Sequence, residues 1–277
     1  MITEYGSVKQ NNDEKVYSFE ADSHRPIGVL DSGVGGISVL RELVKLMPGE
    51  NYIYLGDSAN APYGTKPVQD VIDFTMKNTE FLLNQGAKAI VVACNTATSV
   101  AAQLLREKYP EIPIIGIEPA LKPAVLAKAH SRVLVMATPV TLEQKRFSTM
   151  MHFYEEDADI IKVPCPGLVE LIESGDLEGQ QLREYLEERF ALFDKDKVDA
   201  VVLGCTHYPL IKNLVQKVLP KTTIYDGGFG TAKQTKRRLE ECGLLSAKES
   251  GGKVLFYNSK DTQELLEFSK RLLELPE

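Results

Sequence analysis

Cysteines are the side chains most able to do chemistry in this sequence, and two of the four stand in matched contexts. Cys94 follows an apolar run in the segment AIVVACNT (89–96), and Cys205 follows a similar run in AVVLGCTH (200–207). Each thiol ends a predicted buried strand and precedes a predicted helix, where N–H groups and the helix dipole favour a thiolate. Two thiols facing one cleft suit a two-base reaction, in which one removes a proton and the other returns one to the opposite face. The pair therefore predicts racemisation or epimerisation at a stereocentre.

The other two cysteines lack such a counterpart and are predicted to be structural. Cys165 stands between two prolines, and Cys242 precedes a glycine at the end of a predicted helix. No two cysteines have the CxxC spacing of zinc or redox sites, so no metal is expected. The first 25 residues are charged and carry no apolar block, so they are not a secretory signal. Free thiols in the cytoplasm are the expected state.

Two titratable residues could assist the thiols. Asp31 opens the glycine-rich turn DSGVGG (31–36), which follows a predicted strand and begins a predicted helix. Such a turn can hold an anion on its N–H groups, although a tight turn capped by Asp31 or Ser32 explains it as well. His207 stands two residues after Cys205, either as a proton relay or as a core or capping histidine. A carboxylate after Cys165 is a further candidate for the second thiol.

A cofactor-independent route is the simpler interpretation of these residues. The α-proton of an amino acid is weakly acidic, so the site must stabilise a carbanion-like transition state with N–H groups around the substrate carboxylate. No motif indicates a lysine that would hold pyridoxal phosphate, so no cofactor is expected. The loop GDSANAPYG (56–64) has turn-forming residues, and Tyr63 in it could equally be local packing.

The hydrophobic pattern predicts an α/β fold with two similar halves. Short apolar runs predict strands at 27–30, 51–55, 89–93, 114–117, 133–136, 160–163, 200–203 and 223–225. Helical spacing predicts helices at 37–46, 68–85, 97–108, 141–151, 182–190, 210–218, 231–242 and 262–274. The alternation indicates mostly parallel sheets covered by helices, and such sheets bind ligands at the carboxyl ends of their strands.

Composition narrows the possible partners. Hydrophobic residues make up 43% of the 277-residue sequence, which is enough for a substantial core, and the formal net charge is −7. There is no dense basic block, so no nucleic-acid partner is expected. There is no apolar run of ~18 residues, so no membrane partner is expected either. Residues 1–25 are expected to form a poorly ordered or loosely docked extension.

Four motifs together resemble the glutamate racemase family, within the aspartate/glutamate racemase superfamily. They are DSGVGG (31–36), PYG (62–64), ACNTAT (93–98) and LGCTHYP (203–209), and the resemblance extends from about residue 26 to the C-terminus. It implies a cofactor-independent enzyme that supplies D-glutamate for peptidoglycan, and hence for the cell wall and cell shape. It also implies two pseudo-symmetric α/β domains, 26–117 plus 227–277 and 118–226, with the active site in the cleft between them. A homodimer is expected, with glutamate as the small-molecule substrate.

The resemblance also assigns roles to individual residues. Cys94 and Cys205 are the paired acid and base, assisted by Asp31, His207 and Glu173, with Glu170 as the alternative to Glu173. The implied substrate-binding residues are Asp31, Ser32, Tyr63, Gly64, Asn95, Thr96, Thr206 and His207. The family more often has Gly-Thr where Val140 and Thr141 stand, so no substrate contact is predicted there. Extensions like residues 1–25 go with regulation by a cell-wall precursor in some members, but nothing in this segment shows it.

Three alternatives remain open at this point. A sister racemase for aspartate or a hydantoin-type substrate would use the same fold, because one methylene is worth only ~1–3 kcal/mol of discrimination. A regulatory or binding role, such as modulation of DNA gyrase, could accompany or replace catalysis. A cysteine hydrolase with Cys205 as nucleophile and His207 as base would leave Cys94 unexplained.

Overall fold

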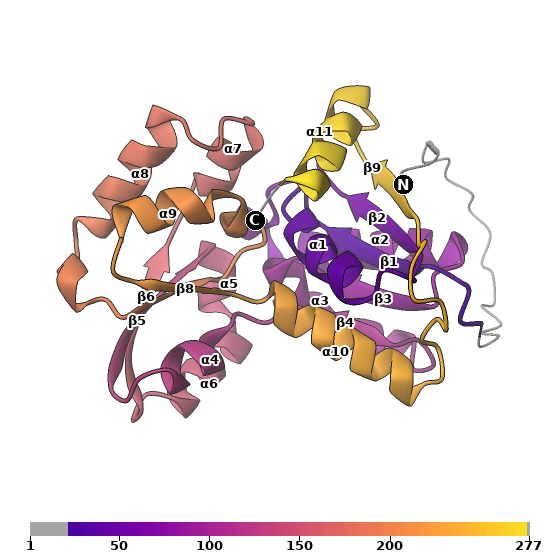
Figure 1. Cartoon of the computed structure of the whole chain (residues 1–277), viewed down its shortest axis with the longest axis horizontal. Coiled ribbons are helices and arrows are strands. Elements are labelled where there is room, and N and C mark those ends of the chain that lie inside the picture. The colour runs from indigo at the N-terminus through magenta and orange to yellow at the C-terminus, as the bar shows by residue number, and fades with distance from the viewer. Residues whose placement is uncertain (1–21, 276–277) are drawn as a thin grey trace.

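The computed structural model describes residues 22–275, so most of the predicted extension (1–25) lies outside the described residues. Two sheets, each with helices on both faces, lie side by side (Figure 1). The first has five strands in the order β4-β3-β1-β2-β9, and the second has four in the order β6-β5-β7-β8. Every neighbouring pair in both sheets is parallel. The predicted fold class is confirmed.

The first sheet is built from β1 (Ile27–Asp31), β2 (Tyr52–Gly56), β3 (Ala89–Val92), β4 (Ile114–Gly116) and β9 (Val254–Asn258). These strands are apolar runs without alternation, because both faces of the sheet are buried. One face packs against α1 (Ile37–Leu46), α10 (Gly228–Glu241) and α11 (Gln263–Glu274). The other face packs against α2 (Val68–Asn84) and α3 (Asn95–Lys108).

The second sheet is built from β5 (Ser131–Ala137), β6 (Ala158–Pro164), β7 (Ala200–Leu203) and β8 (Thr223–Asp226). Its faces are covered by α7 (Leu168–Glu173), α8 (Gln180–Phe190) and α9 (Lys212–Val218) on one side. On the other side lie α4 (Leu121–Leu126), α5 (Pro139–Glu143) and α6 (Lys145–Phe153). The described residues also form three short 3-10 helices: η1 (Tyr63–Thr65), η2 (Lys195–Lys197) and η3 (Tyr208–Ile211).

All eight predicted strands are present with ends shifted by a few residues, but several elements differ from the prediction. No strand was predicted at β9, which pairs with β2 and brings the C-terminal segment back to the first sheet. The predicted helix 141–151 is two helices, because Gln144 adopts an extended backbone between α5 and α6. The predicted helix 210–218 begins as η3, and α4 and α7 were not predicted.

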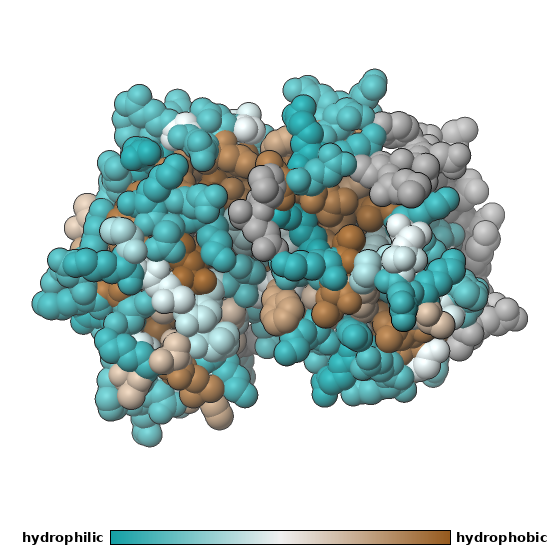
Figure 2. Space-filling view, in the orientation of Figure 1, coloured by the Kyte–Doolittle hydropathy of each residue, from teal (hydrophilic) through white to brown (hydrophobic). Residues whose placement is uncertain are grey.

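The chain passes from the first sheet to the second after β4 and returns after β8, where α10 packs against α1. We propose that the two domains are those expected, 26–117 plus 227–277 and 118–226, one around each sheet. Hydrophilic residues cover most of the face seen in Figure 2, with hydrophobic residues showing between them. Within residues 22–275, no helix is long and apolar enough to cross a membrane.

Candidate active site

Both candidate thiols lie where a strand ends at the carboxyl edge of its sheet. Cys94 follows β3 and is the N-cap of α3, which begins at Asn95 rather than at the predicted residue 97. Cys205 follows β7 after a single glycine and precedes η3. The structure therefore places the two thiols at equivalent positions of the two sheets, as the sequence analysis predicted.

Burial dominates the environment of Cys94, which is only 5% exposed. The backbone N–H of Ala97 donates to its Sγ over 3.5 Å, and the thiol lies 3.6 Å from the hydroxyl of Ser32. Burial, followed by the charges of Asp31 and Cys205, raises the pKa of Cys94 to about 12, although the hydrogen bonds with Ala97 and Ser32 oppose the rise. The expected thiolate at this helix N-terminus is therefore wrong for the resting state, because burial outweighs the N–H groups and Cys94 is held as the thiol.

Cys205 has a different partner, the imidazole of His207. Its Sγ lies 3.8 Å from Nδ1 of His207, whose Nε2 is 2.9 Å from Oε1 of Glu173 at the end of α7. Burial alone would lower the pKa of His207, but the contacts with Cys205 and Glu173 outweigh it and raise the pKa well above its usual value. Burial likewise opposes ionisation of Glu173, and the hydrogen bond and charge of His207 more than compensate and lower its pKa. Glu173, rather than Glu170, is the carboxylate that contacts His207.

Asp31 connects the two halves of the molecule. Its side chain is fully buried at the end of β1, and one carboxylate oxygen accepts from the hydroxyl of Thr206 over 3.0 Å. The other oxygen accepts from the backbone N–H of Gly33. A second link lies beside it, since the hydroxyl of Ser38 is 2.9 Å from the backbone oxygen of Thr206. The carboxyl edges of the two sheets therefore meet at Asp31.

The glycine-rich turn is pressed against the His207–Glu173 pair. A side chain at Gly33 would overlap the carboxylate of Glu173, and one at Gly35 would overlap the imidazole of His207. The backbone N–H of Val34 donates to Glu173 over 3.4 Å. Glycine is needed here for close approach to the second half of the molecule.

A cluster of three threonine hydroxyls closes the other side of the site. Oγ1 of Thr96 lies 3.2 Å from Oγ1 of both Thr138 and Thr141, which are 3.0 Å from each other. A side chain at Gly64 would overlap Thr138, so the 62–64 turn also abuts the second half. Neither Thr138 nor Thr141 was predicted to be a site residue. The Thr138-Pro139 pair carried a signal, because threonine at the N-cap followed by proline begins many helices.

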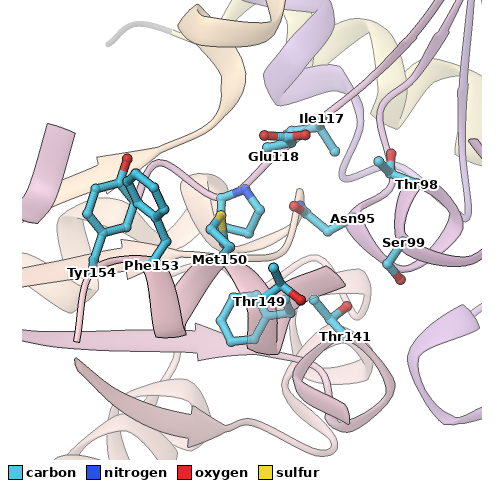
Figure 3. Close-up of a pocket in the computed structure, with 12 residues that line it drawn as sticks. Asn95, Thr98, Ser99, Ile117, Glu118, Thr141, Thr149, Met150, Phe153 and Tyr154 are labelled. Atoms are coloured by element: carbon cyan, nitrogen blue, oxygen red, sulfur yellow. The ribbon is translucent and has the colours of Figure 1, made fainter. Parts of the chain in front are cut away.

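A pocket of about 380 Å³ adjoins this cluster between α3, residues 117–119 and α6 (Figure 3). Its lining includes the polar Asn95 and Thr141 and the apolar Phe147, Met150 and Phe153. Neither candidate thiol lines this pocket, although Asn95 in its wall directly follows Cys94 in the chain. Oδ1 of Asn95 is buried without a hydrogen-bond partner within the described residues.

The other two cysteines lie outside this arrangement. Cys165 is buried in the core beneath α7 and α8, consistent with the structural role predicted for it. Cys242 is exposed at the end of α10, so the packing expected of a structural cysteine is absent there. Within residues 22–275, no group of three or more His, Cys, Asp or Glu side chains could hold a metal ion.

Known proteins share both the sequence and the architecture. Residues 27–235 match the family described as Asp/Glu/Hydantoin racemase. A glutamate racemase of Clostridium acetobutylicum is 52% identical over 252 residues, which are 91% of this chain and 98% of that protein.

Two solved structures have the same fold. The crystal structure of glutamate racemase from Francisella tularensis in complex with D-glutamate has a TM-score of 0.79 at 31% identity, and the match covers 91% of this chain and 95% of that one. The Escherichia coli glutamate racemase structure, with L-glutamate and the activator UDP-MurNAc-ala, has a TM-score of 0.80 at 30% identity, over 90% of this chain and 95% of that one.

Two parallel α/β halves whose carboxyl edges meet, matched in sequence and fold by these relatives, define an amino-acid racemase. The chain belongs to the Asp/Glu/Hydantoin racemase family.

Proposed function

We propose that the chain interconverts L- and D-glutamate, with Cys94 and Cys205 as a pair of proton-transferring thiols. The observation that carries this proposal is the position of one thiol at the carboxyl edge of each sheet, where Asp31 and Thr206 join the two halves. The relatives solved with D-glutamate and with L-glutamate support the choice of substrate.

The surroundings of the two thiols support different roles for them, with Cys205 as the base and Cys94 as the acid in one direction. His207 is in reach to accept the proton of Cys205, and Glu173 stabilises the imidazolium that results. The Cys205 thiolate then removes the Cα proton of the substrate, and the Cys94 thiol gives its proton to the opposite face of the carbanion-like centre. In the reverse direction Cys94 becomes the base, with Asp31 as the nearby carboxylate.

We propose that the substrate is held by the polar groups between the thiols. The candidate residues are Asp31, Ser32, Tyr63, Gly64, Asn95, Thr96, Thr206 and His207, and all are buried. The free Oδ1 acceptor of Asn95 suits a donor such as the substrate ammonium group, because a buried acceptor without a partner costs free energy. Thr141 joins this set through its contact with Thr96, although no substrate contact was predicted there.

The substrate test compares racemisation of L-glutamate, D-glutamate and L-aspartate by circular dichroism, with no added cofactor. We expect kcat/KM for glutamate to exceed that for aspartate by roughly 10-fold or more, since one methylene changes the free energy by ~1–3 kcal/mol. Equal values for the two amino acids would overturn the assignment of glutamate. Dependence on added pyridoxal phosphate or metal would overturn the cofactor-independent route.

The remaining family expectations belong to the same proposal. We place the enzyme in the cytoplasm, where its D-glutamate would enter peptidoglycan synthesis, and we expect a homodimer. Sedimentation velocity at several protein concentrations tests the dimer, and a single monomer boundary throughout would contradict it.

A further inference from the structure

The carboxylate of Asp57 forms a hydrogen-bonded cluster that the proposed proton transfer does not use. Asp57 follows β2 directly and is 2% exposed. Its Oδ2 accepts from the hydroxyl of Tyr63 over 2.5 Å and from the amide of Asn78, on α2, over 3.1 Å. The amide of Asn60 contacts both carboxylate oxygens from the loop itself. A buried carboxylate with three donors around it holds its neighbours in fixed positions.

This cluster engages the only proton of the Tyr63 hydroxyl. A phenol has one proton, and here it is donated to Asp57, while the amide of Asn78 lies 3.2 Å from the same oxygen as a donor. Burial, followed by the charge of Asp57, raises the pKa of Tyr63, so the hydroxyl keeps its proton. The side chain of Tyr63 therefore has no proton left to give to a substrate carboxylate.

The backbone of the 63–64 turn is what remains available to a ligand. Among the described residues, the N–H groups of Tyr63 and Gly64 have no hydrogen-bond acceptor. Both residues are buried, with the Tyr63 ring packed against Phe74 and Gly64 placed against Thr138 of the second half. Adjacent N–H groups in a buried turn form a site for an anion such as a carboxylate.

We infer that Asp57 and Asn78 are positioning residues, which clamp the Tyr63 hydroxyl and thereby aim the N–H groups of Tyr63 and Gly64 at the side-chain carboxylate of the substrate. The inference rests on the proposed glutamate racemisation and adds the residues that select a substrate with a second carboxylate. Asp57 and Asn78 touch Tyr63 and not the reacting atoms, so they act on binding and only weakly on proton transfer.

Steady-state kinetics of Asp57→Asn, Tyr63→Phe and the double variant test the clamp. Tyr63→Phe removes the hydrogen bond, and Asp57→Asn weakens it because the acceptor loses its charge, so we expect KM for glutamate to rise by up to roughly 10-fold while kcat stays within about 3-fold. KM of the double variant should be no higher than that of the more impaired single variant, because one shared interaction cannot be lost twice. Independent, multiplying effects on KM would show that Asp57 does not act through Tyr63.

Two further variants keep the test decisive if Asp57→Asn folds poorly. Asn78→Ala removes one side of the clamp and should raise KM, whereas Asn60→Ala leaves the Asp57–Tyr63 bond in place and should leave KM within about 2-fold. An equal rise in KM in Asn78→Ala and Asn60→Ala would mean that the whole hydrogen-bonded cluster affects binding, and it would refute the clamp. Wild-type protein without glutamate racemase activity would instead refute the proposed function. Active wild type with unchanged KM in Asp57→Asn and Asn78→Ala would refute only this inference.

Discussion

The two candidate thiols differ in what surrounds them, although their sequence contexts match. Cys94 is a buried helix cap next to Asp31, whereas Cys205 faces an imidazole that a carboxylate holds in place. We expect the resting protein to carry the proton on Cys94, and His207 to accept the proton of Cys205 during turnover. The matched motifs predicted the pair, but its asymmetry depends on contacts between the two halves.

Removing either thiol should stop racemisation while leaving the fold in place. For Cys94→Ala and Cys205→Ala we expect kcat to fall by roughly 10²–10⁴-fold or more, the range set by loss of a general acid or base. Circular dichroism of glutamate gives the rate, and far-ultraviolet spectra report the fold. Cys242→Ala is the matched control, because that thiol is exposed and should be replaceable without loss of rate. Full activity in either of the first two variants would contradict the two-thiol mechanism.

The His207–Glu173 pair should make stability depend on pH in a defined direction. The folded pKa of His207 is raised above its unfolded value of ~6.5, so its contribution is complete below that pH and is lost as pH rises through the folded pKa. The folded pKa of Glu173 is lowered, so its contribution is present above ~4.3 and is lost as pH falls through the folded value. We therefore expect Glu173→Gln to cost most between these two values, about 2 kcal/mol, and less at alkaline pH.

Urea unfolding of wild type and Glu173→Gln at several pH values measures this difference. Nitrogen chemical shifts of the His207 ring provide a second observable, because its pKa should fall in the variant. A cost that is the same at every pH would show that Glu173 acts by packing alone.

At the scale of elements, the periodic pattern predicted most strands and helices, and the misses have physical causes. The strand β9 is the segment VLFYN, which follows GGK (251–253), and its β-branched and aromatic residues after two glycines are typical of a strand. The break between α5 and α6 left no mark in the pattern, because Gln144 is compatible with a helix and only its backbone is extended. Thr138 and Thr141 meet Thr96, which is 42 and 45 residues away in the sequence, so motif spacing could not reveal their cluster. Asp57 contacts Tyr63 and Asn60 within its own loop, but turn-forming composition does not indicate which side chains meet there.

The glycine-rich turn offers a test of close approach between elements. In Gly35→Ala the added Cβ overlaps the His207 ring, so the imidazole must shift, and we expect kcat/KM to fall by about 10²-fold. Gly230→Ala is the control, since a Cβ at this position on α10 meets no atom. That variant should keep full activity and gain up to about 0.5–1 kcal/mol of stability. Normal kinetics in Gly35→Ala would contradict the placement of His207.

At the scale of the whole molecule, the candidate site and a buried ion pair lie at opposite ends of the strands of the first sheet. The candidate site lies at the carboxyl ends of the strands, while Glu50 and Lys88 form a buried ion pair just before β2 and β3. The ammonium of Lys88 also donates to the backbone oxygen of Ser23, and Glu50 accepts from the backbone N–H of Ser246. This pair therefore ties segments near both ends of the chain to the first sheet.

Breaking that pair should lower stability without changing the site. Glu50→Gln leaves the Lys88 charge buried and unpaired, and we expect a loss of about 3–5 kcal/mol in the free energy of unfolding with KM unchanged. Glu80→Gln is the control, because its partner Lys108 is half-exposed and the loss should be at most about 1 kcal/mol. Chemical denaturation gives both values, and a raised KM in folded Glu50→Gln would show that the two ends are coupled.

The central claim is that one thiol from each half transfers a proton on its own face of the substrate, and deuterium incorporation tests it most directly. L-glutamate is incubated with the protein in D₂O, and the two enantiomers are separated at low conversion and their Cα deuterium measured by mass spectrometry. We predict that the D-glutamate formed carries deuterium at Cα and that the remaining L-glutamate carries almost none, because different thiols serve the two faces. Product that retains the original proton would show that a single base serves both faces and would contradict the account.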